Sequence, residues 1–431
     1  MIFKTKACSS VKGKIKIPGD KSISHRSLIF SAIAEGKSTI HGMLESEDCL
    51  NTKKAFQAMG VDIQKADKGT YHVEGVGLHG LKAADNVIDC GNSGTTMRLL
   101  SGLLAAQDFL TVLTGDSSLR KRPMDRIMIP LSSMGAQIWA RNDIHAPLAI
   151  KGQELKGIEY VQEVASAQVK SAIILAGLYS EGNTRVIEPA SSRDHTERML
   201  SSFGLDLKID NNIIELQKDR EIRLTAQEIT VPGDISSAAF MIAAALIVKD
   251  SDLIIENVGV NHTRDGILRV LEDMEANIEL FNKRSSGGEE VADIRVTSSE
   301  LKATTIEGDI IPSLIDEIPL IAVLSTQAEG KTIIRDAHEL RVKESDRVKT
   351  TCDGLRKLGV DVEELEDGMI INGPVKLEAD NVSIETYHDH RIAMSFAIAG
   401  LITDGVIDIK NAESINTSFP EFPNLLNEIS K

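Results

Sequence analysis

Three side chains near the N-terminus have the types and spacing to bind an anion. Lys21, Ser22 and Arg26 follow Pro18-Gly19, which ends a strand-like run. A helical pattern of apolar residues starts here, so the three side chains lie in the first turns of a helix, beside free backbone N–H groups. Phosphate and carboxylate groups bind readily at such helix starts. The alternative is a simple N-cap with two solvated charges, and the rest of the chain must decide between them.

Similar cations stand at other turn-to-helix boundaries. Those that could meet an anion are Lys21, Arg26, Arg122, Arg193, Lys343, Arg347 and Arg391. Two of them, Lys343 and Arg347, are four residues apart, so on a helix they would share a face and could clamp one anion. Residues 119–122 and 193–195 can also be explained as a solvated basic run and a local ion pair.

Carboxylates and a glycine-rich turn add to this set. Asp316 lies within an apolar run, where a carboxylate needs a partner or a function, and Glu344 follows the cation Lys343. Residues 91–94 (GNSG) would let a ligand approach backbone N–H groups, but no GK[ST] follows, so this turn is not a Walker loop. Residues 388–390 (HDH) suggest a metal, yet three successive residues rarely converge on one ion, and no metal site is expected. The pattern predicts a cleft for one or two anionic small molecules, with acid–base groups and no nucleophilic triad.

Composition limits the partners of such a cleft. The chain has 431 residues, a net charge of −16 and only 3% aromatic residues, which argues against nucleic acid and anionic membranes. The four cysteines show no metal-ligand spacing, and the N-terminus lacks an apolar signal core. The longest apolar stretch, 238–248, is too short to span a bilayer. We expect a reduced cytoplasmic protein.

Six similar segments fill the chain. In each, a polar turn leads into an apolar helix and then a strand, with a repeat length of about 70 residues. The full unit reads strand, helix, strand, helix, strand, strand, so an α/β or α+β fold is expected. Residues that could end the second helix in a left-handed conformation are Gly60, Gly135, Gly204 and Gly359, with Asn277 in this role in the fourth copy. Three units per domain place the domains at 20–230 and at 1–19 plus 231–431, with a ligand cleft between them.

Eight motifs carry a resemblance that covers essentially the whole chain. They are PGDKSISHRSL (18–28), DCGNSGTTMRLL (89–100), KRP (121–123), SAQVKSAIILAGL (166–178), SRDHTERML (192–200), LIDEIPLIAV (314–323), ELRVKESDR (339–347) and DHRIAMSFA (389–397). Together they resemble the 5-enolpyruvylshikimate-3-phosphate synthases, a family of enolpyruvyl transferases. The resemblance implies two domains of three βαβαββ units each, an inside-out α/β barrel. It also implies the reaction, a step of chorismate and aromatic amino-acid biosynthesis: the enolpyruvyl group of phosphoenolpyruvate moves to the 5-hydroxyl of shikimate 3-phosphate, and phosphate leaves.

The resemblance also implies roles for individual side chains. For shikimate 3-phosphate it implies Lys21, Ser22, Arg26, Ser166, Ala167, Gln168, Ser192, Arg193, Asp316 and Lys343. For phosphoenolpyruvate it implies Lys21, Gly94, Arg122, Gln168, Arg347 and Arg391. Asp316 is the implied proton acceptor, and Glu344 and Lys21 are the implied proton donors. No metal and no organic cofactor is implied, and a monomer is expected.

Four positions depart from the pattern of many family members. His25 stands where many have Asn, and Ala167 where many have a second Ser. Glu339 and Thr417 stand where others have Asn and Lys, so Thr417 puts one family contact to phosphoenolpyruvate in doubt. These changes resemble the branch that includes glyphosate-tolerant enzymes, whereas Gly94 is the residue usual in sensitive ones. The response to glyphosate, a candidate inhibitor, therefore stays open.

Two other functions also stay open. UDP-N-acetylglucosamine enolpyruvyl transferase shares the fold but usually has a cysteine in a mobile loop near the position of Arg122, whereas no cysteine lies between Cys90 and Cys352 here. A non-catalytic anion-binding protein would not need the complete set of Asp316, Glu344 and Lys21.

Overall fold

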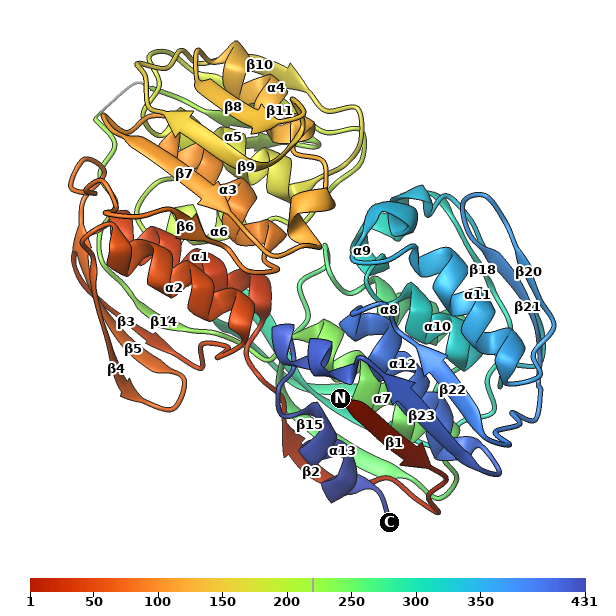
Figure 1. Ribbon diagram of the computed structural model, residues 1–431. Helices are drawn as coiled ribbons and strands as arrows, with labels where there is room; N and C mark the ends of the chain where they lie inside the picture. The colour runs from red at the N-terminus through yellow and green to blue at the C-terminus, as the bar shows by residue number, and fades with distance from the viewer. Residues whose placement is uncertain (219–220) are drawn as a thin grey trace. The chain divides into compact units, whose positions relative to one another are not determined.

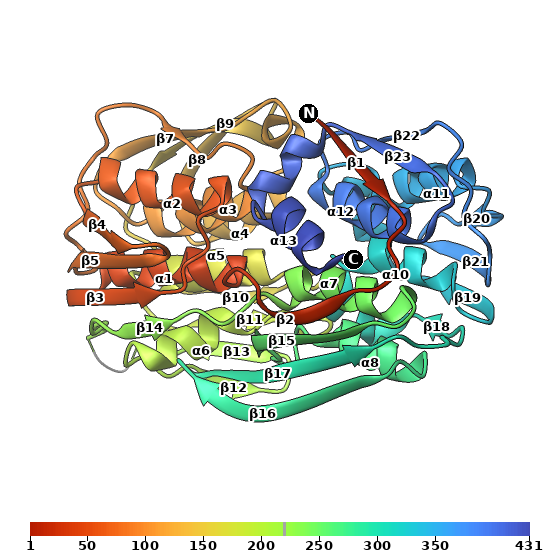
Figure 2. The ribbon, with the colours of Figure 1, turned by 90° about the horizontal axis from the view of Figure 1, so that it is seen from below.

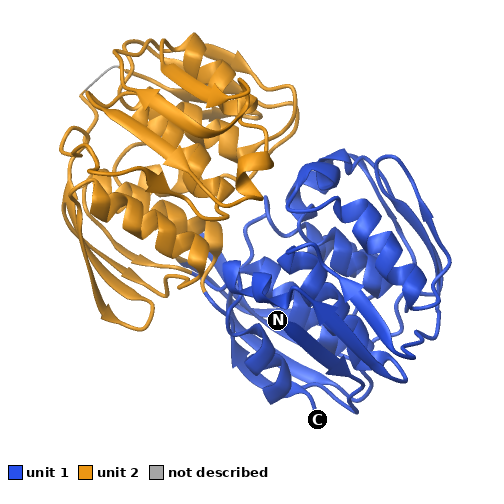
Figure 3. Cartoon of the chain, viewed as in Figure 1, with its two compact units in different colours: residues 1–18, 232–285, 289–431 blue, residues 19–231, 286–288 orange. Residues whose placement is uncertain are grey.

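The computed structural model describes residues 1–218 and 221–431 (Figure 1). These residues form two compact units (Figure 3). Unit 1 comprises residues 1–18, 232–285 and 289–431, and unit 2 comprises residues 19–231 and 286–288. The chain thus passes from unit 1 to unit 2 after Pro18 and returns after Val231.

The described part of unit 2 contains three four-stranded sheets with the same plan. In each, the first strand is parallel to the second, and the other neighbours are antiparallel. In order, the sheets are β14 (Glu228–Thr230), β3 (Glu35–His41), β5 (Thr70–Val76), β4 (Asp62–Asp67); β6 (Ile88–Asp89), β7 (Leu110–Thr114), β9 (His145–Lys151), β8 (Gln137–Arg141); and β10 (Glu159–Val161), β11 (Thr184–Ile187), β13 (Ile213–Leu216), β12 (Lys208–Asp210).

Unit 1 also contains three sheets. They are, in order, β2 (Lys12–Lys16), β15 (Asp252–Gly259), β17 (Glu289–Thr297), β16 (Ile278–Ser286); β18 (Thr305–Ile306), β19 (Gly330–Ile334), β21 (Met369–Gly373), β20 (Val362–Glu364); and β22 (Val382–Glu385), β23 (Val406–Lys410), β1 (Ile2–Lys6). Figure 2 shows the first of them, with β2 beside β15.

The repeats exchange strands where the chain changes unit. The strand β2 precedes the first repeat's helix but pairs in parallel with β15, with Ile15 opposite Ile255. The strand β14 precedes the fourth repeat's helix but pairs with β3, with Ile229 opposite Ile40. The N-terminal strand β1 pairs antiparallel with β23 and completes the sixth sheet. Helices alternate with these strands, so the predicted α/β class built from repeated units is confirmed.

Three helices of each unit are buried along most of their length. They are α1 (Lys21–Ile33), α3 (Gly94–Leu104) and α5 (Ala167–Gly177) in unit 2, and α7 (Ile235–Ile247), α10 (Ile318–Ser325) and α12 (His390–Ala399) in unit 1. Their apolar side chains contribute to the two hydrophobic cores, while α1 also buries polar side chains such as His25 and Arg26. In Figure 1, α3 packs against α5, and α10 packs against α7 and α12.

The remaining helices connect the strands. The α-helices are α2 (Glu47–Ala58), α4 (Asp125–Ser133), α6 (His195–Ser202), α8 (Gly266–Asp273), α9 (Ile311–Leu314), α11 (Arg347–Lys357) and α13 (Phe422–Ile429). The 3-10 helices are η1 (Leu119–Lys121), η2 (Gly308–Ile310), η3 (His338–Val342), η4 (Gly400–Ile402) and η5 (Ala412–Thr417). Within residues 1–218 and 221–431, the chain forms no helix with the length and apolar character needed to cross a membrane.

Helix ends follow the expected chemistry with one exception. Gly60, Gly135, Gly204 and Gly359 all have positive φ angles just after a helix, as predicted. In the fourth repeat the prediction for Asn277 is wrong, because Glu275, with φ 59°, is the residue in the left-handed conformation. The chain turns immediately after Met274, the C-cap of α8, two residues before the position predicted from the sequence.

Candidate active site

Several predicted site residues, including Lys21, Gly94 and Arg391, lie at the starts of the buried helices. Five of these helices have an Asp or Ser N-cap whose side chain accepts a backbone N–H of the first turn: Asp20, Ser93, Ser166, Asp234 and Asp389. Polar side chains directly after each cap therefore stand beside oriented backbone dipoles while the rest of the helix is in the core.

In unit 2, the start of α1 holds the cations noticed first in the sequence. The Lys21 Nζ lies 3.3 Å from Oδ2 of Asp48 on α2. Arg26 is buried and donates from Nε to Thr196 Oγ1 at 2.7 Å and from Nη2 to Ser171 Oγ at 2.8 Å. Its Nη1 donates to the carbonyl of Ser22 at 3.1 Å. These contacts reach α5 and α6, so Arg26 holds three helix starts of this unit together.

The start of α3 is surrounded by two guanidinium groups and an amide. Arg122 donates from Nη2 to Asn92 Oδ1 at 2.8 Å. Arg98, one turn into α3, donates from Nη1 to Gln168 Oε1 at 2.6 Å. A Cβ atom added at Gly94 would lie 2.9 Å from Nη1 of Arg98 and 3.4 Å from Nη1 of Arg122. Both cations thus face the same small space beside the backbone of Gly94.

Gln168 has a defined orientation in this arrangement. Its Oε1 accepts from Arg98, and its Nε2 donates to Thr95 Oγ1 at 2.9 Å. Because Oε1 faces a cation and Nε2 a hydroxyl, the network assigns the two ends of the amide. Gly94, Arg122 and Gln168 were predicted as site residues from the sequence, and Arg98 was not. Its spacing of four residues from Gly94 on one helix was the available signal.

The residues predicted around the shikimate phosphate lie at the starts of α5 and α6. Ser166 caps α5, and Ala167 and Gln168 follow it, all half-buried. Ser192 is buried and donates a short hydrogen bond to Glu188. Arg193 is half-buried in the same turn.

Below this turn lies a buried lysine with two carboxylates. The Lys170 Nζ is 2.8 Å from Glu188 and 2.7 Å from Glu197, and its side chain is 1% exposed. Burial alone would lower the pKa of Lys170, but the two carboxylates outweigh it and raise that pKa. The same burial raises the pKa of Glu197. Sequence reasoning missed this group, because Lys170 looks like one more polar residue at a helix start.

In unit 1, Arg347 joins the two carboxylates predicted to move protons. It donates from Nη1 to Asp316 Oδ1 at 3.1 Å and from Nη2 to Glu344 Oε2 at 2.7 Å. Its Nε donates to Asp389 Oδ2 at 2.8 Å. The Arg347 side chain is 1% exposed, while those of Asp316 and Glu344 are 20% and 18% exposed. Burial would lower the pKa of Arg347, but the three carboxylates outweigh it and raise that pKa.

Asp389 therefore explains the HDH sequence. It caps α12 by accepting the N–H of Arg391 at 2.9 Å, and it also accepts from Ser345 Oγ at 3.0 Å. Its carboxylate is fully buried and shared between a helix cap and Arg347. The contacts with Ser345 and Arg347 were missed in the sequence, because these residues lie more than 40 positions away.

Arg391 is another buried cation of unit 1. Its Nη1 donates to the carbonyl of Ser236 at 3.3 Å and lies 3.8 Å from Oε1 of Glu317. Arg264 donates to Ser236 Oγ at 2.6 Å. Burial raises the pKa of Glu317, although Arg391 and Arg264 both act to lower it. The carboxylate next to Asp316 in the sequence thus belongs to an internal ion network.

Lys343 differs from its prediction. We expected Lys343 and Arg347 to share a helical face, and this is wrong. Lys343 ends η3 in an extended conformation, and Asp346 caps the new helix α11, which starts at Arg347. Burial lowers the pKa of the Lys343 ammonium, although Asp316 acts to raise it. Lys343 is therefore close enough to Asp316 to interact with it electrostatically, although the two cations do not share a helix face.

The surroundings of Thr417 and of the basic run 119–122 bear on two questions that the sequence left open. Thr417 ends η5, and its hydroxyl donates to the carbonyl of Ser414 at 2.8 Å, so it brings no charge to this region. In the basic run 119–122, Arg120 and Lys121 are exposed, and only Arg122 is drawn to the start of α3. The run is thus part solvated surface and part of the candidate site.

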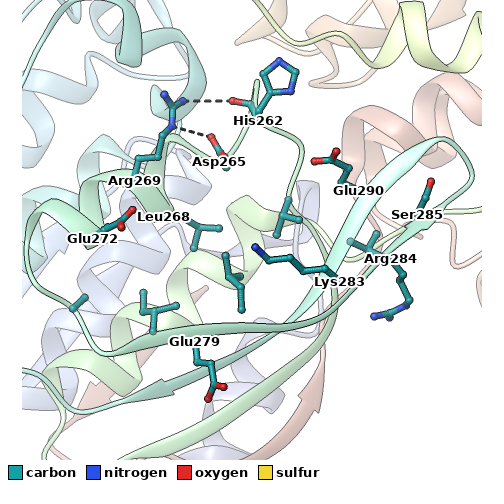
Figure 4. Close-up of a pocket in the computed structure, with 15 residues that line it drawn as sticks. His262, Asp265, Leu268, Arg269, Glu272, Glu279, Lys283, Arg284, Ser285 and Glu290 are labelled. Carbon is teal, nitrogen blue, oxygen red and sulfur yellow. Dashed lines mark hydrogen bonds and ion pairs between the residues drawn. The ribbon is translucent and has the colours of Figure 1, made fainter.

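A groove of about 950 Å³ in unit 1 lies elsewhere (Figure 4). It is formed by α8 and the β16–β17 hairpin, and its walls carry both signs of charge, including Asp265, Arg269, Glu272 and Lys283. Arg269 is paired with Asp265 at 2.9 Å. None of the residues predicted to bind substrate lines this groove.

Cations at buried helix starts, together with two carboxylates on a buried arginine, are the arrangement expected of an enzyme that acts on anionic substrates. The model of the EPSP synthase (3-phosphoshikimate 1-carboxyvinyltransferase) family matches residues 5–426. The 3-phosphoshikimate 1-carboxyvinyltransferase of Thermodesulfovibrio yellowstonii is 52% identical over 429 residues, with 99% of each chain covered. That of Gloeothece citriformis is 54% identical over 423 residues, covering 97% of this chain and 94% of the relative.

Solved structures agree with these relatives. EPSP synthase from Acinetobacter baumannii is 48% identical, with a TM-score of 0.88 over 100% of this chain and 98% of that one. The enolpyruvyl transferase NikO from Streptomyces tendae shares the fold, with a TM-score of 0.78 at 14% identity. The chain therefore belongs to the EPSP synthase family. The family, the enzyme class and the transferase function predicted from the sequence are confirmed.

Proposed function

We propose that this chain, acting as a monomer, moves the enolpyruvyl group of phosphoenolpyruvate to the 5-hydroxyl of shikimate 3-phosphate by addition and elimination. In the addition, the hydroxyl oxygen bonds to C2 of phosphoenolpyruvate, its proton goes to a base, and an acid protonates the C3 methylene to a methyl group. In the elimination, a methyl proton is removed, the C2–O bond to phosphate breaks, and phosphate leaves. The reaction thus needs a base and an acid that exchange roles.

Asp316 serves as the base for the 5-hydroxyl, and Glu344 and Lys21 serve as proton donors. The observation that carries this proposal is the shared contact of Asp316 and Glu344 with the buried guanidinium of Arg347. One fixed cation orients both carboxylates, while the side chains of Asp316 and Glu344 stay partly exposed.

Shikimate 3-phosphate takes the cations and hydroxyls of α1, α5 and α6. Ser166, Ala167 and Gln168 supply the first turn of α5, where backbone N–H groups favour a phosphate. Lys21, Ser22, Arg26, Ser192 and Arg193 add charge and hydrogen-bond donors, and Asp316 and Lys343 contact the ring hydroxyls. This assignment rests on the charge, burial and positions described above.

The residues proposed to bind phosphoenolpyruvate are Lys21, Gly94, Arg122, Gln168, Arg347 and Arg391. Support comes from the two guanidinium groups beside Gly94 and from the buried arginines of unit 1. Arg98 supports this set by fixing the amide of Gln168. Thr417 leaves the set one cation smaller than in many family members.

Release of inorganic phosphate tests the proposed function. Enzyme mixed with phosphoenolpyruvate and shikimate 3-phosphate should release phosphate in a ratio of one per enolpyruvyl ether formed. With UDP-N-acetylglucosamine as acceptor there should be no release above background. Phosphate release with the nucleotide sugar alone would contradict the assignment of the acceptor.

One methyl group at position 94 should weaken inhibition of the enzyme by glyphosate. The Cβ of Gly94→Ala would lie 2.9 Å from Nη1 of Arg98, so this guanidinium must shift, but it is the end of a long side chain and the variant should still fold. The methyl would occupy the space between the two guanidinium groups. We expect the glyphosate inhibition constant to rise at least tenfold, about 1.4 kcal/mol. The KM for shikimate 3-phosphate serves as the internal control and should stay within about twofold. An unchanged inhibition constant would remove Gly94 from the anion site.

Loss of the Lys343 proton should weaken binding of shikimate 3-phosphate at alkaline pH. The pKa of Lys343 is lowered by burial, so the ammonium loses its proton at lower pH than an ordinary lysine as the pH rises. Only the charged form donates to shikimate hydroxyls fully, so the KM for shikimate 3-phosphate should increase as the pH rises towards the ordinary lysine pKa of about 10.4. Lys343→Arg stays charged throughout this range, and its KM should be flat, whatever its absolute value. A wild-type KM that is also flat would show that Lys343 does not bind this substrate in its charged form.

A further inference from the structure

Behind the start of α1, four buried polar side chains form a continuous line across unit 2. His25 Nδ1 lies 2.7 Å from Thr52 Oγ1, and Thr52 Oγ1 lies 2.7 Å from Thr96 Oγ1. Thr96 Oγ1 donates to Ser93 Oγ at 2.7 Å. All four side chains are 0% exposed. The line therefore joins α1, α2 and the N-cap of α3 with no access to solvent.

The hydrogen-bond directions along the line determine which ring nitrogen of His25 carries hydrogen. The single hydroxyl proton of Thr96 goes to Ser93, so Thr96 Oγ1 accepts the proton of Thr52. Thr52 Oγ1 has then used its own proton and must accept from His25, so Nδ1 carries the hydrogen. Burial, with help from Lys21 and Arg26, lowers the pKa of His25 well below its ordinary value, so the ring is neutral. The Nε2 atom is buried and has no hydrogen-bond partner among residues 1–218 and 221–431.

The line lies one helical turn behind Lys21. Lys21 and His25 are four residues apart on α1, and their partners Asp48 and Thr52 are four residues apart on α2. The contacts Lys21–Asp48 and His25–Thr52 thus form two successive rungs between the same two helices. At its other end the line stops at Ser93, the residue immediately before Gly94.

We propose that His25 is a positioning residue, which donates its Nδ1 proton into the Thr52–Thr96–Ser93 line and thereby holds Lys21 in register with Gly94. The proposal rests on the proposed function, because that function gives Lys21 and Gly94 their roles. What the line requires at position 25 is a donor one bond beyond Cγ. Asparagine offers such a donor in Nδ2, whereas leucine has the same size and no donor.

Matched variants separate the donor from the volume. His25→Asn and Thr52→Ser keep the line, and we expect kcat/KM for both substrates within about threefold of wild type. His25→Leu and Thr52→Val remove a donor at similar volume, and we expect kcat to fall at least tenfold and the KM for phosphoenolpyruvate to rise. Ser31→Ala on the same helix is the control, because its buried hydroxyl is outside the line. It should behave as wild type.

A purely structural role would give a different pattern. It would lower the melting temperature and the fraction of active enzyme while kcat per active site and both KM values stayed unchanged. The proposal would be overturned if His25→Leu, shown by circular dichroism to be folded, had the wild-type kcat and KM values. Equal losses in His25→Asn and His25→Leu would also overturn it.

The tautomer gives a readout that does not depend on activity. In ¹⁵N-labelled full-length protein, the His25 signals are those absent from the spectrum of His25→Asn, among the ten histidines of the chain. We expect a protonated Nδ1, a bare Nε2 and no titration across neutral pH. A ring protonated at Nε2 in an active enzyme would overturn the positioning role alone. A wild-type enzyme that fails to turn over would overturn the proposed function, and the positioning role with it.

Discussion

Asp316→Asn is expected to lower turnover of shikimate 3-phosphate and phosphoenolpyruvate by about 10²–10⁴-fold, the usual range for loss of a general base. The amide has the size of the carboxylate but cannot take the proton of the 5-hydroxyl. It can still accept from Arg347 through Oδ1, which the carboxylate does now at 3.1 Å. The dissociation constant for shikimate 3-phosphate should therefore change much less than kcat. Stopped-flow phosphate release and calorimetric titration measure the two quantities.

The exposed Asp309 on η2 provides a matched control for this substitution. Asp309→Asn makes the same chemical change in the same unit and should leave both constants as in wild type. If Asp316→Asn turned over at the wild-type rate, Asp316 would not be the base. If binding and turnover fell by the same factor, its role would be to bind substrate rather than to move a proton.

Arg347→Met is expected to destabilise the protein strongly as well as inactivate it. The substitution removes the cation shared by Asp316, Glu344 and Asp389, and it leaves the fully buried Asp389 without its charged partner. Removing one member of a buried ion group typically costs about 3–5 kcal/mol. The KM for phosphoenolpyruvate should rise in whatever enzyme remains folded. Urea denaturation followed by far-UV circular dichroism measures the loss of stability.

Two further variants serve as comparisons for the stability of Arg347→Met. Arg347→Lys keeps the charge but cannot reach all three carboxylates at once, so it should lose less stability than Arg347→Met. Arg295 makes an equally close pair with Asp252, at 2.9 Å, but both side chains are nearly half exposed. Arg295→Met should therefore unfold at almost the wild-type urea concentration. An Arg347→Met protein as stable as Arg295→Met would show that the buried cation is not needed for the fold.

The sequence predicted the features that are local. Each N-cap, the apolar helix after it and the polar residues between them lie within a few positions, so the sequence alone could place Lys21, Ser166 and Arg391 at helix starts. The glycines that end the second helices follow the same local rule. Repetition of these signals six times indicated the α/β class.

Features that depend on distant partners could not be predicted in the same way. The exchange of β2 and β14 between sheets is decided by strand pairing across more than 180 residues. Asp389 joins Arg347 from 42 positions away, so the HDH sequence alone could not reveal this contact. Lys343 and Arg347 have helical spacing, but the cap at Asp346 starts a new helix between them. Spacing predicts a shared face only where the helix is continuous.

Arg98 is a candidate site residue that sequence motifs alone did not identify. It lies inside a helix whose start drew the attention, and its guanidinium folds back towards Gly94 along the helix. Side chains on a helix point towards its N-terminus, so a cation four residues inside can serve the first turn. This rule could have identified Arg98 from the sequence.

Deuterium incorporation is the most direct test of the proposed addition and elimination. In D₂O the acid that protonates C3 of phosphoenolpyruvate carries deuterium, and the methyl group formed can lose either isotope when phosphate leaves. Enzyme with both substrates should therefore yield product with deuterium in the enolpyruvyl methylene group, as seen by NMR. Product that forms in D₂O with no deuterium at this carbon would contradict the account.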